Sequence, residues 1–109
     1  MIEKLYRIKG TEPFLRKYQS LLNPIEIEKF QKFKERLKIN PYIGDPLRVK
    51  FVREFKTETG KRLYFLIYEE INIVLFVALS NKKKQKATIN RIFEKLEEFK
   101  EYVYKIYKS

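Results

Sequence analysis

The run from Ile71 to Leu79 constrains the fold more than any other part of the sequence. Its nine residues, Ile-Asn-Ile-Val-Leu-Phe-Val-Ala-Leu, are almost all apolar. A strand with one face in water alternates apolar and polar residues, whereas a strand covered on both faces does not. We therefore expect a strand that is central in its sheet or covered on both faces.

Two segments before this run also have the pattern of strands. Apolar residues alternate within Leu47 to Lys56, and Leu63 to Tyr68 is rich in aromatic and branched side chains. The links are short, Thr57-Glu58-Thr59-Gly60 after the first strand and Glu69-Glu70 after the second. Consecutive strands should therefore pair as antiparallel hairpins. A short first strand is also expected at Leu5 to Ile8.

Helices are expected on either side of these strands. Thr11 is a candidate N-cap for a helix that ends before Pro24, and Asn23 is a candidate N-cap for the next helix. In that second helix, apolar residues recur every three or four positions from Pro24 to Lys38. The segment Asn40 to Pro46, with two prolines and a glycine, breaks the second helix. A third helix should begin in the lysine-rich stretch after Asn81 and run nearly to the end of the chain.

This order of elements predicts an α+β protein. We expect an N-terminal helical hairpin packed on a small antiparallel sheet, followed by a C-terminal helix. The 109 residues are too few for two independent cores, and nine Phe and eight Tyr can fill one core. A single domain over residues 1–109 is therefore expected.

The charge predicts a polyanionic partner. Lys and Arg number 25 against 14 Asp and Glu, a net charge of +11. Enrichment in Lys and Glu, as in proteins from hot environments, would increase the numbers of positive and negative residues together. It therefore does not explain the excess of positive residues. Nucleic acid, an acidic protein and an anionic membrane surface all fit the sign of the charge.

The absence of Cys and His excludes several kinds of chemistry. Without Cys the chain has no disulfide, no thiolate metal site and no cysteine nucleophile, and without His it lacks the commonest metal ligand and neutral-pH base. We expect no metal, no cofactor and a location in the reducing cytoplasm. No apolar run approaches the roughly 18 residues of a membrane span, so neither secretion nor membrane insertion is expected.

The carboxylates do not form a metal site in the sequence. Glu26, Glu28 and Glu35 lie on a predicted helix among lysines, and Glu69 and Glu70 lie at a hairpin turn. None is paired in the way that a hydrolytic metal site needs. A glycine motif that would cradle phosphate is also missing.

Basic residues gather on the predicted sheet, where antiparallel pairing would bring several together. Those on the first two strong strands are Arg48, Lys50, Arg53, Lys56, Lys61 and Arg62. Arg53 falls on the row of Phe51 and Phe55, so either the strand is bulged there or Arg53 lies where the apolar row meets a cleft.

Arg62, Tyr64 and Tyr68 share one face of the second strand. A guanidinium binds phosphate through paired donors, and a tyrosine ring can stack on an unpaired base. The two tyrosines could equally pack within the sheet, since tyrosine is a good strand former.

The lysine run after the last strand is a third candidate for anion binding. Its members are Lys82, Lys83, Lys84 and Lys86. Cations near a helix N-terminus oppose the helix dipole, so a bound phosphate or partner carboxylate would relieve them. The alternative is a solvated helix start.

Four runs together resemble the RelE/ParE toxins of type II toxin-antitoxin systems. The similarity spans roughly residues 25 to 92, and it rests on the order of the runs. They are Asn40-Pro41-Tyr42-Ile43-Gly44-Asp45-Pro46-Leu47, Arg53-Glu54-Phe55-Lys56, Gly60-Lys61-Arg62-Leu63-Tyr64-Phe65-Leu66-Ile67-Tyr68 and Val77-Ala78-Leu79-Ser80-Asn81-Lys82-Lys83-Lys84-Gln85-Lys86.

The resemblance implies a toxin that cleaves messenger RNA without metal, commonly in the ribosomal A site, and so inhibits translation. It implies mRNA, the ribosome and a cognate antitoxin as partners. Arg62 matches the basic residue that faces the scissile phosphate after a glycine turn. Arg53 and Lys56 match basic positions of the preceding strand, and Lys82 to Lys86 match the basic loop after the last core strand.

The chain departs from the family pattern after that loop. Many active members have a Tyr or His there, whereas this chain has Ala87, Thr88 and Ile89. Lys56, Lys82 or Tyr68 would then have to move the proton. The catalytic candidates are therefore Arg53, Lys56, Arg62, Tyr68 and Lys82, and the nucleic-acid-binding candidates are Arg48, Lys50, Lys61, Tyr64, Lys83, Lys84 and Lys86.

The missing base favours an alternative function on the same fold. The chain could be a non-catalytic module that binds RNA, the ribosome or a protein, such as a degenerate toxin or a gyrase-type inhibitor. Binding without cleavage would distinguish this module from an endonuclease.

Overall fold

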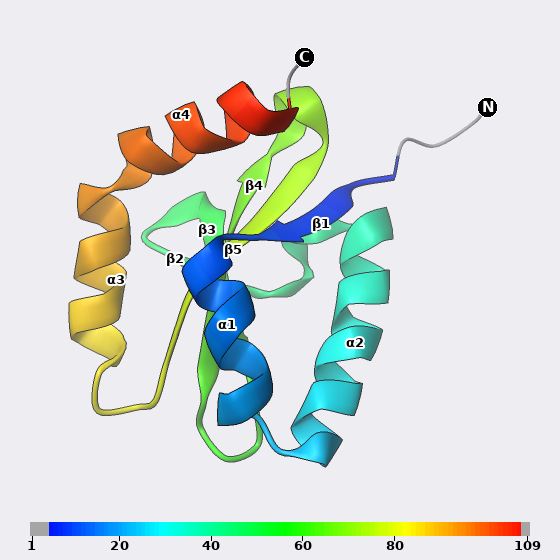
Figure 1. Cartoon of the computed structure of the whole chain (residues 1–109), viewed down its shortest axis with the longest axis vertical. Coiled ribbons are helices and arrows are strands. Elements are labelled where there is room, and N and C mark those ends of the chain that lie inside the picture. The colour runs from blue at the N-terminus through cyan, green and yellow to red at the C-terminus, as the bar shows by residue number, and fades with distance from the viewer. Residues whose placement is uncertain (1–4, 108–109) are drawn as a thin grey trace.

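The computed structural model describes residues 5–107 and contains four α-helices and five strands in that range (Figure 1). Short 3-10 turns at Pro41–Ile43 and Glu69–Ile71 connect some of them. The elements are β1 (Arg7–Gly10), α1 (Glu12–Leu21), α2 (Pro24–Ile39), β2 (Asp45–Leu47), β3 (Val49–Lys56), β4 (Arg62–Tyr68), β5 (Ile73–Ser80), α3 (Gln85–Glu94) and α4 (Leu96–Tyr107).

The five strands form one sheet in the order β1-β5-β4-β3-β2. The strands β2 to β5 pair antiparallel in sequence order, which confirms the predicted hairpins, and β1 pairs parallel with β5. Strand β5 lies between β1 and β4, and residues of both of its faces are buried. The apolar run that begins at Ile71 therefore has the covered position that its composition predicts.

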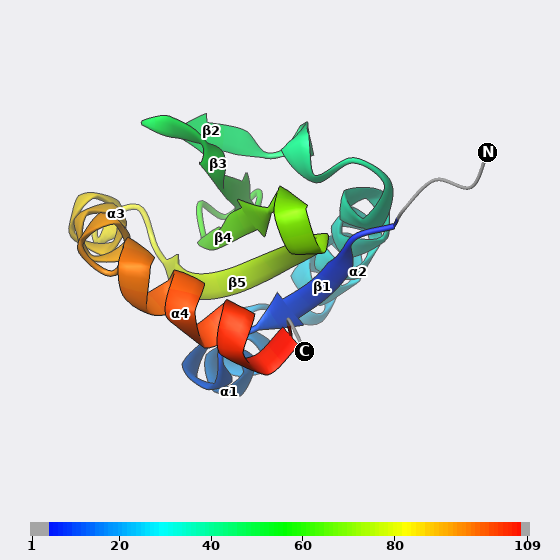
Figure 2. The same cartoon turned by 90° about the horizontal axis from the view of Figure 1, so that it is seen from above.

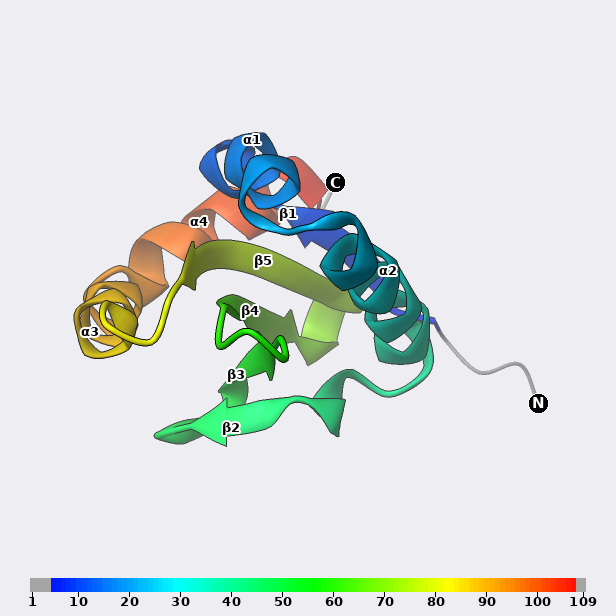
Figure 3. The same ribbon diagram turned by 90° about the horizontal axis from the view of Figure 1, so that it is seen from below.

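Helices cover both faces of the sheet (Figures 2 and 3). On one face, α1 and α2 bury Phe14, Phe30 and Phe33 against Phe65 and Phe76 of the sheet. On the other face, α3 and α4 bury side chains against the opposite row of the strands. That second core comprises Val52, Tyr64, Leu66, Ile73, Leu75, Val77, Ile92 and Val103. The alternation along β4 divides its residues between the two cores.

The predicted caps are present at the starts of α1 and α2. Thr11 Oγ1 accepts a hydrogen bond from the Phe14 amide at 3.4 Å. Asn23 and Glu26 form a reciprocal capping box, in which each side chain accepts from the other's backbone amide at 2.8 and 3.0 Å. Both helices therefore begin where the sequence places their caps.

Three features of the sequence-based fold prediction need correction. The helical hairpin does not come first, because β1 precedes it and makes the sheet mixed. The expected strand from Leu47 to Lys56 is a β2–β3 hairpin that turns at Arg48, whose φ of 58° ends the strand. The expected C-terminal helix breaks at Lys95, and the bend lets α3 and α4 pack on the same core.

None of the helices in residues 5–107 is long and apolar enough to cross a membrane. The longest, α2, has sixteen residues and buries only one side, with Phe30, Phe33 and Leu37 in the core. Its remaining surface carries Lys and Glu, as expected for an amphipathic helix on a sheet.

Candidate functional site

The register of the sheet gathers polar residues at the end where β3 and β5 finish and β4 begins. Lys56, Arg62 and Ser80 form one row across β3, β4 and β5, and Glu54 and Tyr64 form part of the next. These residues lie on the face covered by α3 and α4, because Tyr64 belongs to that core. We call the group of Glu54, Lys56, Arg62, Tyr64, Ser80 and the nearby Gln85 the Arg62 site.

An ion pair between Arg62 and Glu54 lies at the centre of this site. Arg62 Nε is 3.5 Å from Glu54 Oε1, and both side chains are more than nine-tenths buried. The Arg62 Nη1 group donates to the Gly60 carbonyl at 3.0 Å, but Nε has no hydrogen-bond acceptor. A buried guanidinium nitrogen without an acceptor is costly, so this position favours an incoming anion.

Glu54 is held from the helix side by Gln85, the first residue of α3. The Gln85 Nε2 group donates to Glu54 Oε1 at 3.4 Å. Burial raises the pKa of Glu54, and the Arg62 charge opposes that increase without cancelling it. A carboxylate with a raised pKa accepts a proton more readily than an exposed one.

Tyr64 contributes to this site by packing. Its ring is completely buried, and its hydroxyl lies 2.8 Å from Ser80 Oγ. The expectation that Tyr64 stacks on a base does not fit this position, because neither face of the ring is open. The Tyr64–Ser80 contact instead joins β4 to the end of β5, next to Arg62.

The lysine run follows directly from this site. Ser80 ends β5, the Asn81 side chain accepts a hydrogen bond from the Lys84 amide at 3.0 Å, and Gln85 begins α3. The lysines of the run are exposed and lie beside the helix start, which has no side-chain cap. They are Lys82, Lys83, Lys84 and Lys86. The run therefore places positive charge next to the Arg62 site, beside the start of α3.

Arg53 does not join the site, because it lies on the opposite face of β3. Its buried guanidinium donates to the carbonyls of Tyr42, Gly44 and Lys50 at 2.7 to 3.0 Å. Three of its four hydrogen bonds go to Tyr42 and Gly44 in the segment before β2, and the fourth goes to Lys50 of β3. These bonds give Arg53 a structural role on the face of β3 that is turned away from Arg62.

Tyr68 also lies away from the site, at the other end of β4. Its ring meets Tyr104 edge-on, with centroids 6.3 Å apart, and burial raises the pKa of its hydroxyl. Tyr68 lies six residues along the strand from Arg62, about 20 Å, so this hydroxyl cannot exchange protons at Arg62. The structure therefore does not support Tyr68 as a catalytic residue.

Two predicted nucleic-acid contacts flank the site on the β2–β3 hairpin. Arg48 donates to Asn90 of α3 and stacks over the Phe93 ring, 4.9 Å from its centroid. Lys50 is exposed, with its amino group 4.7 Å from the centre of the Tyr42 ring. A cavity of about 310 Å3 separates the hairpin from α3. Its lining includes Arg48, Gln85 and Lys86, so it adjoins the Arg62 site.

The protein-family and curated-protein comparisons find no match for this sequence. Solved structures do match. A double arginine-to-alanine mutant of the E. coli toxin RelE in the free state has a TM-score of 0.64 at 16% identity, over 81% of this chain and 98% of that chain. The chain has the RelE fold.

Two RelE complexes with antitoxins support this assignment. The same E. coli mutant with an antitoxin RelBc peptide has a TM-score of 0.59 at 17% identity, over 77% of this chain and 94% of that chain. The archaeal RelE–RelB complex from Pyrococcus horikoshii OT3 gives 0.54 at 18% identity, over 72% and 96%. At these identities the similarity establishes the RelE fold.

Within the RelE fold, sequence reasoning missed Glu54 and Gln85. Glu54 shares the strand parity of Lys56, so a predicted hairpin register would have placed it next to Arg62. Gln85 gave no such signal, because its contact with Glu54 depends on how α3 docks on the sheet. Among residues 5–107, no group of three or more Asp and Glu side chains is placed to hold a metal ion.

Lys61, predicted to bind nucleic acid, instead contacts a buried carboxylate on the other side of the sheet. Its amino group lies 2.8 Å from Glu26 Oε1, and Thr59 donates to the other carboxylate oxygen. Burial raises the pKa of Glu26, but the bonds from Lys61, Thr59 and the Asn23 amide outweigh it and lower the pKa to about 2. These bonds fasten the β3–β4 turn to the start of α2.

Glu26→Gln is expected to lower the free energy of unfolding at pH 7 by about 2 kcal/mol, since it removes a half-buried ion pair. The folded-state pKa lies below the ordinary value of 4.5, so the contribution is complete above pH 4.5 and is lost as the pH falls towards 2. Urea unfolding of the unmodified protein and of Glu26→Gln at pH 7 and pH 3 measures the contribution of Glu26. An equal difference in the free energy of unfolding at both pH values would contradict the prediction.

Proposed function

We propose that the chain is the toxin of a type II toxin-antitoxin pair, an endonuclease that cleaves messenger RNA on the ribosome without metal and so inhibits translation. The RelE fold, the net charge of +11 and the Arg62 site support this proposal. The similar structures include toxin–antitoxin complexes, so we further propose a cognate antitoxin for this chain.

One observation carries the proposal. A buried arginine with an unoccupied donor lies beside a carboxylate whose pKa is raised. A phosphate oxygen would give Arg62 Nε its missing acceptor, and Glu54 would lie next to the attacking hydroxyl. Glu54 of β3 would thus act as the general base, in place of the Tyr or His that is missing after the lysine run.

The proposed reaction is a transesterification within the RNA. Glu54 accepts the proton of the 2'-hydroxyl while the 2'-oxygen bonds to the adjacent phosphorus. Arg62 stabilises the negative charge that develops on the phosphoryl oxygens. The bond from phosphorus to the 5'-oxygen breaks, and a lysine ammonium, of Lys56 or Lys82, protonates the leaving oxygen. The products are a 2',3'-cyclic phosphate and a 5'-hydroxyl.

RNA must displace the cover of the site to reach it. Arg62 and Glu54 are buried beneath the start of α3, where the Gln85 contact with Glu54 is long at 3.4 Å. Breaking this weak hydrogen bond costs little free energy, and the contact of a phosphate with Arg62 would offset that cost. Exposed cations would hold the RNA on either side of the opening, namely Arg48, Lys50, Lys56, Lys82, Lys83, Lys84 and Lys86.

The rate of RNA cleavage is expected to fall in acid at a higher pH than an ordinary glutamate would cause. Glu54 must be ionised to accept the proton, and burial raises its pKa, so activity is lost as the pH falls through that raised value. A pH–rate profile of kcat/KM measures the effect. Glu54→Gln should abolish this acid limb and lower the rate by roughly 10²-fold or more. An unchanged limb in Glu54→Gln would reject Glu54 as the base.

The proposal as a whole is tested in a translating cell extract. The protein is added, and the ends of the messenger RNA are mapped by primer extension. Cuts in phase with codons support the endonuclease. Blocked translation with intact messenger RNA would favour the non-catalytic module.

A further inference from the structure

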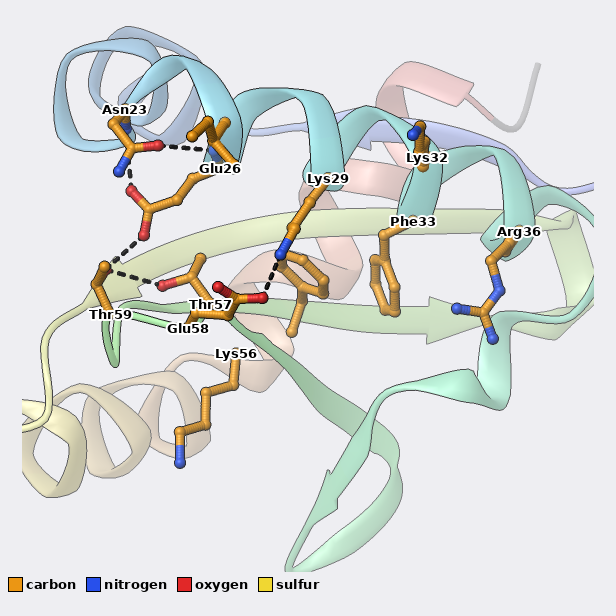
Figure 4. Close-up of a pocket in the computed structure, with 12 residues that line it drawn as sticks. Asn23, Glu26, Lys29, Lys32, Phe33, Arg36, Lys56, Thr57, Glu58 and Thr59 are labelled. Atoms are coloured by element: carbon orange, nitrogen blue, oxygen red, sulfur yellow. Dashed lines mark hydrogen bonds and ion pairs between the residues drawn. The ribbon is translucent and has the colours of Figure 1, made fainter.

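A second surface feature lies on the opposite face of the sheet from the Arg62 site. A groove of about 420 Å3 runs between α2 and the turn that joins β3 to β4 (Figure 4). Six of its residues define what we call the α2 groove. They are Ile25, Lys29, Phe33 and Arg36 of α2, with Phe55 of β3 and Glu58 of the turn.

The groove exposes apolar surface. The Phe33 ring projects from α2 into the space above the sheet in Figure 4, and it packs on Phe55 with ring centroids 4.4 Å apart. Phe55 is half-buried, and Ile25, in the first turn of α2, is 68% exposed. An apolar side chain from a partner would remove this surface from water.

Positive charge lines the same groove. Lys29 and Arg36 are two helical turns apart, about 10.5 Å along α2, and both come from the wall that carries Phe33. Lys29 pairs across the groove with Glu58, but both side chains are exposed, so the pair stabilises little. Arg36 has no ion-pair partner within residues 5–107. Both cations are therefore available to an anionic partner.

We propose that the α2 groove is a docking site for an acidic, amphipathic segment of a partner protein. Carboxylates spaced by two helical turns would meet Lys29 and Arg36. Apolar side chains of the same segment would pack on the exposed Ile25 and the half-buried Phe55. Lys29 would exchange its weak contact with Glu58 for a carboxylate of the partner. The charge of this partner complements the net charge of +11.

The composition of the groove favours a peptide over RNA. Phe33 is only 7% exposed and is packed against another ring, so it offers no open face to a base. An aliphatic surface at Ile25 also suits an apolar side chain better than a nucleotide.

The position of the groove separates its role from RNA cleavage. Phe33 and Phe55 belong to the core of one face of the sheet, whereas Tyr64 beside Arg62 belongs to the core of the other. Lys56 belongs to the Arg62 site and also lines the groove, so a bound segment would lie against the Lys56 edge of that site without contacting Arg62, which does not line the groove. The inference does not rest on the proposed endonuclease activity and survives if that activity is absent.

The test uses the full chain and a fluorescein-labelled synthetic peptide of glutamate and leucine in amphipathic helical order. Fluorescence anisotropy measures the dissociation constant, and NMR amide shifts locate the site. We expect shifts in α2 and residues 57–59. Arg36→Glu should weaken binding roughly tenfold, and Ile25→Ser by a smaller factor. Lys17→Glu, an exposed charge reversal on α1, should leave the affinity unchanged.

Three results would overturn the proposal. The first is equal binding of a peptide in which serine replaces every leucine, since it would show attraction by charge alone. The second is an equal loss of affinity in Lys17→Glu and Arg36→Glu. The third is displacement of the peptide from this groove by single-stranded RNA, which would assign the groove to nucleic acid.

Discussion

Replacement of Arg62 by methionine is expected to lower the rate of messenger-RNA cleavage by roughly 10³-fold, a loss of about 4 kcal/mol of transition-state stabilisation. Methionine keeps the unbranched aliphatic part of the side chain but removes the guanidinium charge that would face the phosphate. The Arg62 guanidinium is buried and its Nε has no acceptor, so this donor is available to a phosphate in a site shielded from bulk solvent. Primer extension in a translating extract measures the cleavage.

Two companion variants separate catalysis from folding. Arg91→Met removes an exposed arginine of α3, the helix whose start covers the Arg62 site. This variant should retain full cleavage. Arg62→Met also leaves Glu54 buried without its cation, so Arg62→Met combined with Glu54→Gln restores a neutral interior. If the double variant is folded by circular dichroism and still cleaves at the normal rate, Arg62 is not catalytic.

Arg53→Met should lower the free energy of unfolding by about 3 kcal/mol and the Tm by roughly 15 °C. Its guanidinium donates to three backbone carbonyls, at Tyr42, Gly44 and Lys50. Methionine fills the space of the aliphatic stem but leaves these carbonyls without a donor. The loop that leads into β2 should then loosen. Thermal and urea unfolding measure both quantities.

Arg48→Met provides the matched control for this prediction. Arg48 is an exposed arginine on the same hairpin, and its contacts are with side chains of α3. Its loss should lower the free energy of unfolding by less than about 1 kcal/mol.

Below its Tm, Arg53→Met should cleave RNA at a rate within a few-fold of the unmodified protein. A loss as large as that of Arg62→Met, in a folded protein, would return Arg53 to the catalytic set.

Local patterns were sufficient to predict most of the elements. The caps at Thr11 and Asn23, the turn at Gly60 and the apolar run from Ile71 depend on neighbours within a few residues. Such signals act before the chain has folded, so they can be found in the sequence. The position of Arg62 after the Gly60 turn was found in the same way.

The roles of the basic residues could not be predicted from local patterns. Arg53 lies in β3, Arg62 begins β4 and Lys61 directly precedes β4, so the three have similar surroundings in the sequence. In the fold, Arg53 binds loop carbonyls, Lys61 binds Glu26, and Arg62 binds Glu54. These partners are distant in sequence or on another face, and side-chain chemistry alone does not distinguish them.

The sequence by itself determined a small basic protein with a covered central strand, because composition and periodicity fix which surfaces must be buried. Only the tertiary structure decided that β1 joins the sheet, that Glu54 meets Arg62, and that α3 covers them both. A parallel strand pair and a helix docked on a sheet depend on contacts between residues far apart in the chain. Those contacts form only when the whole core packs.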